Sequence, residues 1–157
     1  TEMITVEDEL NYVKQYMNIQ KYRYLEAMSV VYDAEEEILN CIIPRLILQP
    51  IVENAIIHGF ARINKPGLIS VKIFKDDDVI RMEVTDNGIG LTRLEIDKIQ
   101  QGLDFPKNST GIGLKNVNER IKLAFGEMFG VTIFSEPELF TTVEIIIPEI
   151  RRGQHAT

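Results

Sequence analysis

The first part of the chain repeats apolar residues at helical spacing. Thr5-Val6-Glu7-Asp8 has the form of a capping box, with Thr5 as the N-cap and Asp8 at the third helical position. A helix that is apolar over a wide arc contacts more than one neighbour, so we expect either burial within this domain or contact with a segment or subunit outside it. The arc consists of one stripe of Val6, Leu10, Val13, Met17 and Tyr24 and an adjacent stripe of Tyr12, Tyr16 and Ile19.

The next stretch contains four strand-like runs and one helix. Residues Met28–Asp33 and Ile38–Ile43 have the composition of strands, and a helix is predicted from about Arg45 to Phe60. The alternating runs Ile69–Phe74 and Val79–Val84 predict a pair of strands joined by an acidic turn. The predicted helix has a buried face of Leu48, Ile51, Val52 and Ala55 and another face of Gln49, Glu53, Asn54, Ile57 and His58.

The last part of the chain adds two helices and two strands. A short helix is predicted from Leu94 to Gln101, and a second one begins after Gly113 and ends at Gly126. The strands Gly130–Ser135 and Thr141–Ile147 complete the pattern. Strands beside well-formed helices, with one hairpin, indicate a two-layer α/β sandwich. A regular β-α-β-α alternation is absent, which argues against a doubly wound dinucleotide fold.

The composition is that of an ordinary globular domain. The chain has 157 residues, of which 45% are hydrophobic and 26% charged, and this length fits one domain. Its formal net charge of −7 argues against a nucleic-acid-binding protein, although a helix N-terminus and a divalent ion can still hold a polyphosphate. The single cysteine, Cys41, excludes an intrachain disulfide and is expected to be a small buried side chain in a reducing compartment.

The sequence also indicates a compartment. No apolar run approaches the roughly 18 residues of a membrane span, and no signal peptide begins at Thr1. We therefore expect either a cytosolic chain or the cytosolic part of something longer.

An acidic glycine motif, Thr85-Asp86-Asn87-Gly88-Ile89-Gly90-Leu91, follows a predicted strand. A carboxylate fixed at the end of a strand can accept a hydrogen bond from an exocyclic amine, and Gly88 and Gly90 let a flat ring approach the backbone. Taken alone, Asn87-Gly88 is more typical of a hairpin turn. The segment that follows is not a returning strand, however, and this favours a binding role for Asp86.

Glu53 and Asn54 lie in the middle of a predicted helix, where an amide has little structural reason to be. The oxygen of an asparagine is a suitable ligand for Mg²⁺, and Glu53 could order or deprotonate a metal-bound water. A solvated polar face is the simpler interpretation of the pair. His58, one turn later, is either a packing residue or a contact to a nucleotide or partner.

A second glycine motif, Gly111-Ile112-Gly113-Leu114, opens the later helix. It places backbone N–H groups and a helix N-terminus where an anion can bind, although a flexible glycine loop before a helix gives the same pattern. No cluster of histidine and cysteine indicates zinc, and no arrangement of serine, cysteine and histidine indicates a hydrolase triad.

Taken in this order, the amide-bearing helix and the two glycine motifs resemble the nucleotide site of the Bergerat-type ATPases, the superfamily of gyrase, MutL, the ninety-kilodalton heat-shock chaperones and histidine kinases. Residues 48–59 closely resemble the N box of the LytS/YesM-type sensor histidine kinases, and residues 111–121 resemble their second glycine box. The stretch from Glu9 to Arg23 resembles the helix that leads into their catalytic domain. The resemblance covers roughly Thr5 to Pro148. It implies the Bergerat ATP-binding fold, an α+β sandwich with a mixed, mostly antiparallel sheet and helices on one face.

The resemblance also implies a role for each motif. Asn54 would bind Mg²⁺ and act in catalysis with Glu53, and Asp86 would accept a hydrogen bond from the amine of adenine. Residues 91–110 would form a mobile lid over the triphosphate of ATP. The other residues that would contact ATP are His58, Gly88, Gly90, Gly111, Gly113, Leu114 and Thr141, the last of which falls where related ATPases place a threonine near the adenine-binding aspartate.

Three positions depart from the family pattern. Ile57 stands where many histidine kinases have a lysine, so a phosphate contact is lost or is supplied by Lys115 or Arg120. Phe140 replaces a glycine that often precedes the threonine of the last strand. Pro50 stands where gyrase-like members have their catalytic glutamate, which argues against ATP hydrolysis of the gyrase kind.

The resemblance implies that residues 27–150 are the ATP-binding catalytic domain of a two-component sensor histidine kinase. Residues 1–26 would be the helix that leads from a dimerisation and phosphoacceptor region outside this chain, and 151–157 a disordered tail. Neither His58 nor His155 matches the acceptor motif. The γ-phosphoryl is therefore expected to pass to a histidine outside this chain, and then to a response regulator.

The expected setting is a cytoplasmic domain of a membrane-anchored sensor that forms a homodimer only in the full-length protein. Two other functions remain open. One is an ATP-gated interaction module of the same fold without phosphotransfer, to which Ile57 and Phe140 give some weight. The other is an anti-sigma-type serine kinase, which shares the glycine boxes but lacks the N-terminal helix pattern.

Overall fold

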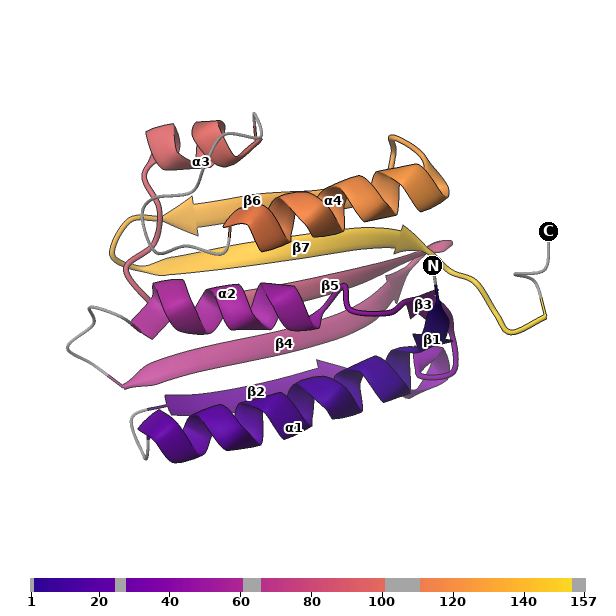
Figure 1. Ribbon diagram of the computed structural model, residues 1–157, viewed down its shortest axis with the longest axis horizontal. Helices are drawn as coiled ribbons and strands as arrows, with labels where there is room; N and C mark the ends of the chain where they lie inside the picture. Colours follow the sequence, from indigo (N-terminus) through magenta and orange to yellow (C-terminus); the bar gives the residue numbers. More distant parts are fainter. Residues whose placement is uncertain (1, 25–27, 61–65, 101–110, 154–157) are drawn as a thin grey trace.

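The protein folds into two layers, a β-sheet and a layer of helices that covers one face of it (Figure 1). The computed structural model describes residues 2–24, 28–60, 66–100 and 111–153. The elements are β1 (Met3–Thr5), α1 (Val6–Tyr24), β2 (Met28–Ala34), the 3₁₀ helix η2 (Glu36–Ile38), β3 (Ile42–Pro44), α2 (Gln49–Phe60), β4 (Gly67–Asp76), β5 (Val79–Asp86), α3 (Arg93–Gln100), α4 (Gly111–Phe125), β6 (Gly130–Glu136) and β7 (Phe140–Pro148).

The main sheet has five strands in the order β2-β4-β5-β7-β6. Strand β2 runs parallel to β4, and every other neighbouring pair in this sheet is antiparallel. The short strands β1 and β3 form a separate antiparallel pair. The mixed, mostly antiparallel sheet and the single helical layer confirm the fold expected from the sequence.

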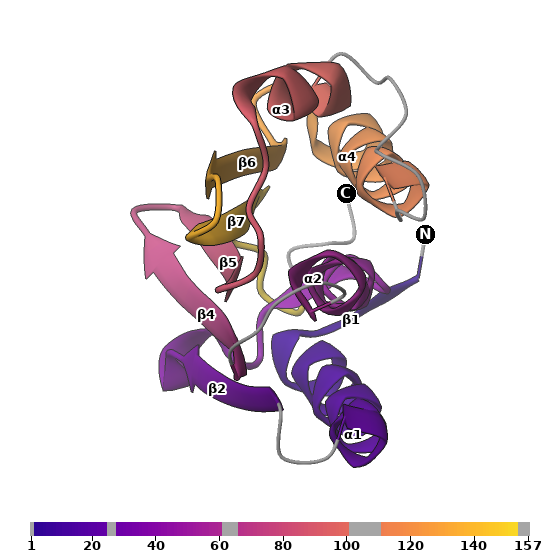
Figure 2. The same cartoon turned by 90° about the vertical axis from the view of Figure 1, so that its left-hand side faces the viewer.

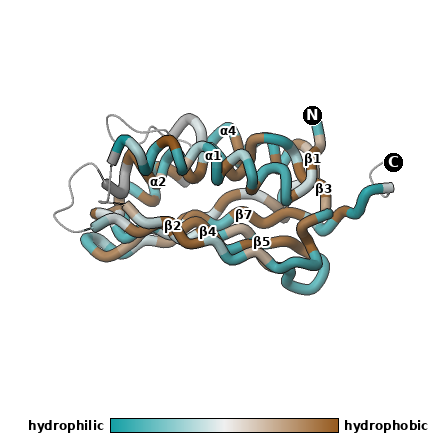
Figure 3. Tube along the Cα trace, turned by 90° about the horizontal axis from the view of Figure 1, so that it is seen from below, coloured by the Kyte–Doolittle hydropathy of each residue, from teal (hydrophilic) through white to brown (hydrophobic). Residues whose placement is uncertain are grey.

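Helices α1, α2 and α4 lie side by side over the sheet, while α3 lies at its β6 edge (Figure 2). The apolar residues of the two layers face each other, so the core is the space between the helices and the sheet (Figure 3). The alternation in the central strands explains this arrangement. In β5, for example, Ile80, Met82 and Val84 are buried, whereas the residues between them are partly exposed. Cys41 is fully buried, as the sequence predicts.

Helix α1 buries one of its two apolar stripes. Its capping box is formed, because the amide of Asp8 donates to Oγ1 of Thr5 at 3.0 Å. The stripe from Val6 to Met17 lies in the core. In the second stripe, Tyr16 packs partly against the core, whereas Tyr12 and Ile19 are 46% and 64% exposed. Among the described residues, none of the helices combines the length and the apolar composition that a membrane span requires.

Two predicted elements around residue 40 differ in the structure. The strand expected at Ile38–Ile43 is instead the 3₁₀ helix η2 followed, after a turn, by the short strand β3. The helix expected from Arg45 begins only at Gln49, because Leu46 adopts a φ of 60°, which the α-helix does not allow. Helical spacing alone could not reveal this break, since the residues from 45 to 48 have ordinary helix-forming side chains.

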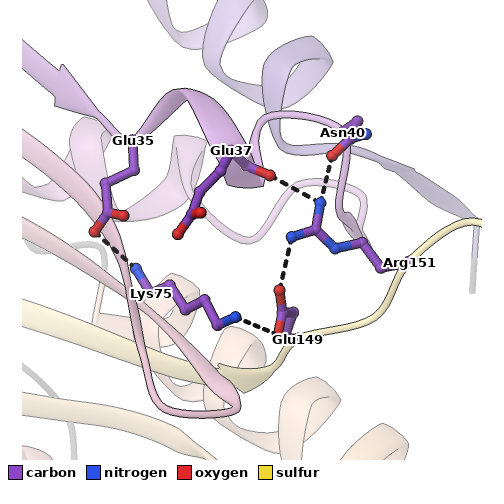
Figure 4. A network of polar contacts seen from close by, with 6 residues as sticks. All are labelled: Glu35, Glu37, Asn40, Lys75, Glu149 and Arg151. Atoms are coloured by element: carbon purple, nitrogen blue, oxygen red, sulfur yellow. Dashed lines mark hydrogen bonds and ion pairs between the residues drawn. The ribbon is translucent and has the colours of Figure 1, made fainter.

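Part of the segment expected to be a disordered tail is held by hydrogen bonds. The stretch 151–157 was expected to be disordered, but Arg151 is held by side-chain and backbone groups, and 154–157 lie outside the described residues. The guanidinium of Arg151 donates to the carbonyl oxygen of Glu37, to Oδ1 of Asn40 and to the carboxylate of Glu149, at 2.7 to 2.8 Å (Figure 4).

Candidate nucleotide-binding site

The fold brings the predicted motifs to one end of the molecule. The end of β5, the start of β7, the start of α4 and the C-terminal end of α2 all lie there (Figure 1). Helix α2 packs against both β5 and α4. The strongest single link is in the sheet, where Asp86 and Thr141 are directly opposite each other in the register of β5 and β7. The sequence separates these two residues widely, yet the resemblance predicts their proximity and the structure places them together.

Asp86 is a buried carboxylate at the end of β5. It is only 4% exposed and accepts a hydrogen bond of 2.9 Å from the amide of Gly88. Burial raises the pKa of this carboxyl from 3.8 to about 6, and the bond from Gly88 opposes the shift only in part. A buried acceptor of this kind is suited to a polar group of a ligand, because such a group can replace the water that the carboxylate has lost.

The turn after Asp86 is an irregular connection that leads to α3, and the hairpin interpretation of Asn87-Gly88 is therefore wrong. Asn87 ties this turn to the start of β4. Its Oδ1 accepts from the amide of Leu68 at 2.7 Å, and its Nδ2 donates to the carbonyl oxygen of Pro66 at 3.1 Å. This side chain therefore fixes the loop whose Gly88 amide donates to Asp86.

Gly90 is required by the geometry of this loop. Its φ of 72° favours glycine, and a Cβ there would lie 2.3 Å from the carbonyl oxygen of Glu136. The loop therefore passes directly against the end of β6.

Ser135 connects this loop to Thr141, a contact that the sequence analysis missed. Its Oγ accepts from the amide of Leu91 at 2.7 Å, donates to the carbonyl oxygen of Phe140 at 2.7 Å and lies 2.9 Å from Oγ1 of Thr141. A single serine in a strand carries no sequence signal for such a role. This role becomes apparent only from the pairing of β6 with β7, which places Ser135 opposite Thr141.

Helix α2 carries the predicted catalytic pair. Asn54 is 3% exposed, so it does not lie on a solvated polar face. Glu53 is partly buried and accepts from Nε2 of Gln49 at 3.1 Å. Within the described residues, no group of three or more histidine, cysteine, aspartate or glutamate side chains could hold a metal ion. A Mg²⁺ ion here would have to share Asn54 with phosphate and water, which is the way this ion is usually held. One buried amide oxygen is compatible with that partial role, in which phosphate and water supply the remaining ligands.

The second glycine motif forms the first turn of α4, which begins at Gly111 rather than after Gly113. Its N-terminal end can therefore offer backbone N–H groups to an anion. Leu114 is buried and anchors this turn to the core. Arg120, one of the two candidates to replace the missing lysine, donates to the carbonyl oxygens of Arg45 and Leu46.

Three expected features lie partly outside the described residues. His58 is in the last turns of α2, but its side chain is not described. The first half of the expected lid contains α3, which is capped reciprocally. The amide of Glu95 donates to Oγ1 of Thr92 at 3.2 Å, and the amide of Thr92 donates to the carboxylate of Glu95 at 2.9 Å. The second half of the lid, 101–110, lies outside the described residues.

Together the fold and this arrangement define a nucleotide-binding domain of the ATPase class. The chain belongs to the family of Histidine kinase-, DNA gyrase B-, and HSP90-like ATPases, whose pattern it matches over residues 42–151. ATP is therefore the nucleotide, and the resemblance seen in the sequence is confirmed.

Two curated relatives are sensor histidine kinases. The chain is 35% identical to sensor histidine kinase YesM of Bacillus subtilis, with 94% of this chain and 24% of the relative covered. It is 36% identical to sensor histidine kinase YpdA of Escherichia coli, with 80% of this chain and 22% of the relative covered. The chain thus spans about a quarter of the length of the curated relatives it matches.

Solved structures show the same fold. The catalytic domain of histidine kinase ThkA superposes with a TM-score of 0.72 at 16% identity, and 95% of each chain is covered. The mycobacterial sensor histidine kinase MprB superposes with a TM-score of 0.68 at 10% identity, over 96% of this chain and 98% of the other. By sequence the chain belongs to this ATPase family, and its fold is that of histidine kinase catalytic domains.

Proposed function

We propose that this domain binds Mg-ATP and transfers the γ-phosphoryl group to a histidine on a segment outside this chain. The observation that carries the proposal is the pairing of Asp86 with Thr141 across β5 and β7. The glycine loop beside this pair passes so close to β6 that a side chain at Gly90 would collide with the carbonyl oxygen of Glu136. A buried acceptor carboxylate at this position suits the exocyclic amine of adenine. Gly88 lies next to the carboxylate and would let the ring approach the backbone.

The phosphates would extend from the adenine site toward α2 and α4. Asn54 would hold Mg²⁺, whose charge would neutralise the phosphates in the transition state. Glu53 would orient a metal-bound water or the attacking group. The backbone N–H groups around Gly111 and Gly113 would bind phosphate oxygens. His58 and Leu114 would complete the contacts to ATP, the first through its side chain and the second by fixing the turn.

The transfer breaks the bond between the γ-phosphorus and the oxygen that bridges it to the β-phosphate, and ADP leaves. A phosphorus–nitrogen bond forms on the imidazole of the acceptor. Positioning supplies most of the rate, because the attacking nitrogen must lie in line with the leaving oxygen. This chain supplies the donor site, and the acceptor comes from another segment.

We also propose how this domain is connected to the rest of a larger protein. Residues 1–26, which contain α1, would lead from a dimerising acceptor helix into residues 27–150, and α1 would share the core of that catalytic domain. The acceptor would then pass its phosphoryl group to a response regulator. A membrane-anchored sensor that dimerises through the region outside this chain would hold the domain in the cytoplasm.

A transfer assay tests this function. The 157-residue chain is incubated with Mg²⁺, ATP labelled in the γ-phosphate and a separately produced acceptor-helix fragment. We expect label on the fragment that is stable in alkali and lost in acid, as a phosphoramidate is, and no label when Asn54→Ala replaces the wild-type chain. Tight ATP binding without label would favour the interaction module. Label that survives acid would indicate a serine kinase.

A further inference from the structure

Contacts from α1 and α4 meet at residues 45–49, which comprise the segment between β3 and α2 and the first residue of α2. Glu9, on α1, is fully buried there. Its two carboxylate oxygens accept from the amides of Leu46 at 3.0 Å, Leu48 at 2.9 Å and Gln49 at 3.4 Å. A buried charge is stable only when such bonds replace its hydration, so this contact fixes α1 against the start of α2.

The cap of α2 is unusual because it comes from a distant part of the chain. A helix normally finds a cap in the residue just before it, such as serine or aspartate. Here that residue is Leu48, whose side chain has no acceptor. The carboxylate of Glu9 takes over this role, and its negative charge also complements the positive end of the dipole of α2. The first turn of α2 therefore depends on where α1 lies.

Helix α4 holds the same segment from another side. The guanidinium of Arg120 donates to the carbonyl oxygen of Leu46 at 2.8 Å and to that of Arg45. Leu46 thus has its amide bound to α1 and its carbonyl bound to α4. Its φ of 60° is strained for a residue with a side chain. Such a conformation persists only when its surroundings impose it, and here Glu9 and Arg120 do so together.

The same helices carry the proposed ATP contacts. Asn54 lies five residues beyond Gln49 on α2, which is about 7.5 Å along the helix axis at 1.5 Å per residue. Gly111 and Gly113 form the first turn of α4, the helix that carries Arg120. A change in the position of α1 would therefore move the metal-binding helix and the phosphate-binding helix relative to each other.

We propose that Glu9, assisted by Arg120, is a positioning residue that couples the placement of α1 to the geometry of the Mg-ATP site. The inference rests on the proposed function, because it assumes that Asn54 holds Mg²⁺ with ATP. Glu9 does not touch the nucleotide. It acts through α2, so its effect on ATP binding depends on Asn54.

The test is a double-mutant cycle on the 157-residue chain, with the Kd for Mg-ATP measured by titration calorimetry. Glu9→Gln keeps the shape of the side chain but places an NH₂ group against backbone amides. We expect it to raise the Kd for Mg-ATP about 3- to 30-fold, the range of coupled neighbouring groups. Glu7→Gln is the matched control, because Glu7 is an exposed residue of the same helix. It should leave the Kd unchanged.

The cycle separates positioning from simple loss of stability. With Asn54→Ala already present, we expect Glu9→Gln to change the Kd less than about twofold. The position of α2 then no longer affects a metal ligand, because the amide oxygen of Asn54 is absent. A residue that merely stabilises the fold would weaken binding by the same factor in both backgrounds, and that result overturns the inference. An unchanged Kd for Glu9→Gln in the wild-type background also overturns it.

If Glu9→Gln does not fold, Arg120→Gln takes its place in the same cycle, since it leaves Glu9 intact. An unchanged Kd there counts against the inference, and a rise that vanishes with Asn54→Ala supports it. If Asn54→Ala by itself leaves Mg²⁺-dependent binding intact, the proposed function fails. If it weakens binding while Glu9→Gln and Arg120→Gln do not, only the inference fails.

Discussion

At the scale of single residues, Asp86 is the side chain that we expect to distinguish adenine from guanine. Its carboxylate can accept from the amine of adenine, but it would face a carbonyl oxygen in guanine. We expect ATP to bind about 5- to 150-fold more tightly than GTP, since an unmatched buried polar pair costs about 1 to 3 kcal/mol. Asp86→Asn should remove most of this preference. Competition binding with both nucleotides measures it, and equal affinities in the wild-type chain would refute the assignment.

The raised pKa of Asp86 makes this preference depend on pH. Below a pH of about 6 the carboxyl is protonated and can donate to the carbonyl oxygen of guanine. We therefore expect the ratio of the GTP and ATP dissociation constants to fall as pH decreases from 7.5 to 5. The titration of the phosphates is common to both nucleotides and cancels in this ratio. A ratio that stays constant over this range would show that Asp86 does not contact the base.

Asn54 is the residue on which the metal dependence rests. Without its amide oxygen, Mg²⁺ would lose its one expected protein ligand on α2. We expect Asn54→Ala to abolish the difference between the ATP affinities measured with Mg²⁺ and with EDTA, while metal-free binding persists. Calorimetry under both conditions measures this difference. Equal wild-type affinities with and without Mg²⁺ would remove the basis for the metal site.

At the scale of elements, the site depends on contacts between strand ends. Ser135 on β6 connects the loop after Gly90 with the start of β7. Ser135→Ala leaves the amide of Leu91 without its acceptor, so we expect a loss of about 1 to 3 kcal/mol in the free energy of unfolding. Hydrogen exchange at the amide of Leu91 should also become faster. Thr132→Ala, on the same strand, is the control and should leave that amide unaffected.

At the scale of the whole molecule, the buried carboxylate of Asp86 lowers stability. Because its folded-state pKa is raised from 3.8 to about 6, the folded protein binds more protons than the unfolded chain between these values. Its contribution to stability therefore falls as pH rises through this window, and the full penalty remains above it. At pH 7 the penalty is up to about 3 kcal/mol, from 1.36 kcal/mol per pKa unit.

Asp86→Asn removes this ionisation and should stabilise the domain at pH 7 while it impairs ATP selectivity. The gain over the wild-type chain should shrink as pH decreases from about 6 to about 4. Urea denaturation of both proteins at several pH values measures the difference. A mutant that is less stable than wild type at pH 7 would contradict the desolvation argument.

The family and most of the elements are predictable from the sequence alone. Helical spacing and alternation located α1, α4 and the hairpin of β4 and β5, because these segments have one buried face and a regular period. The order of the glycine motifs around Asp86 identified the ATPase class. Such signals are local, since each depends on residues that lie close together in the chain.

How these elements are joined depends on contacts between distant parts of the chain. The late start of α2 follows from Leu46, whose backbone is set by Glu9 and Arg120 from two other helices. Arg120, a candidate for a phosphate contact by sequence, donates to the carbonyl oxygens of this segment. No sequence pattern indicates the roles of Ser135 and Glu9 either. The physical reason is the same in each case, because a hydrogen bond between residues far apart in the chain leaves no periodic pattern in the sequence.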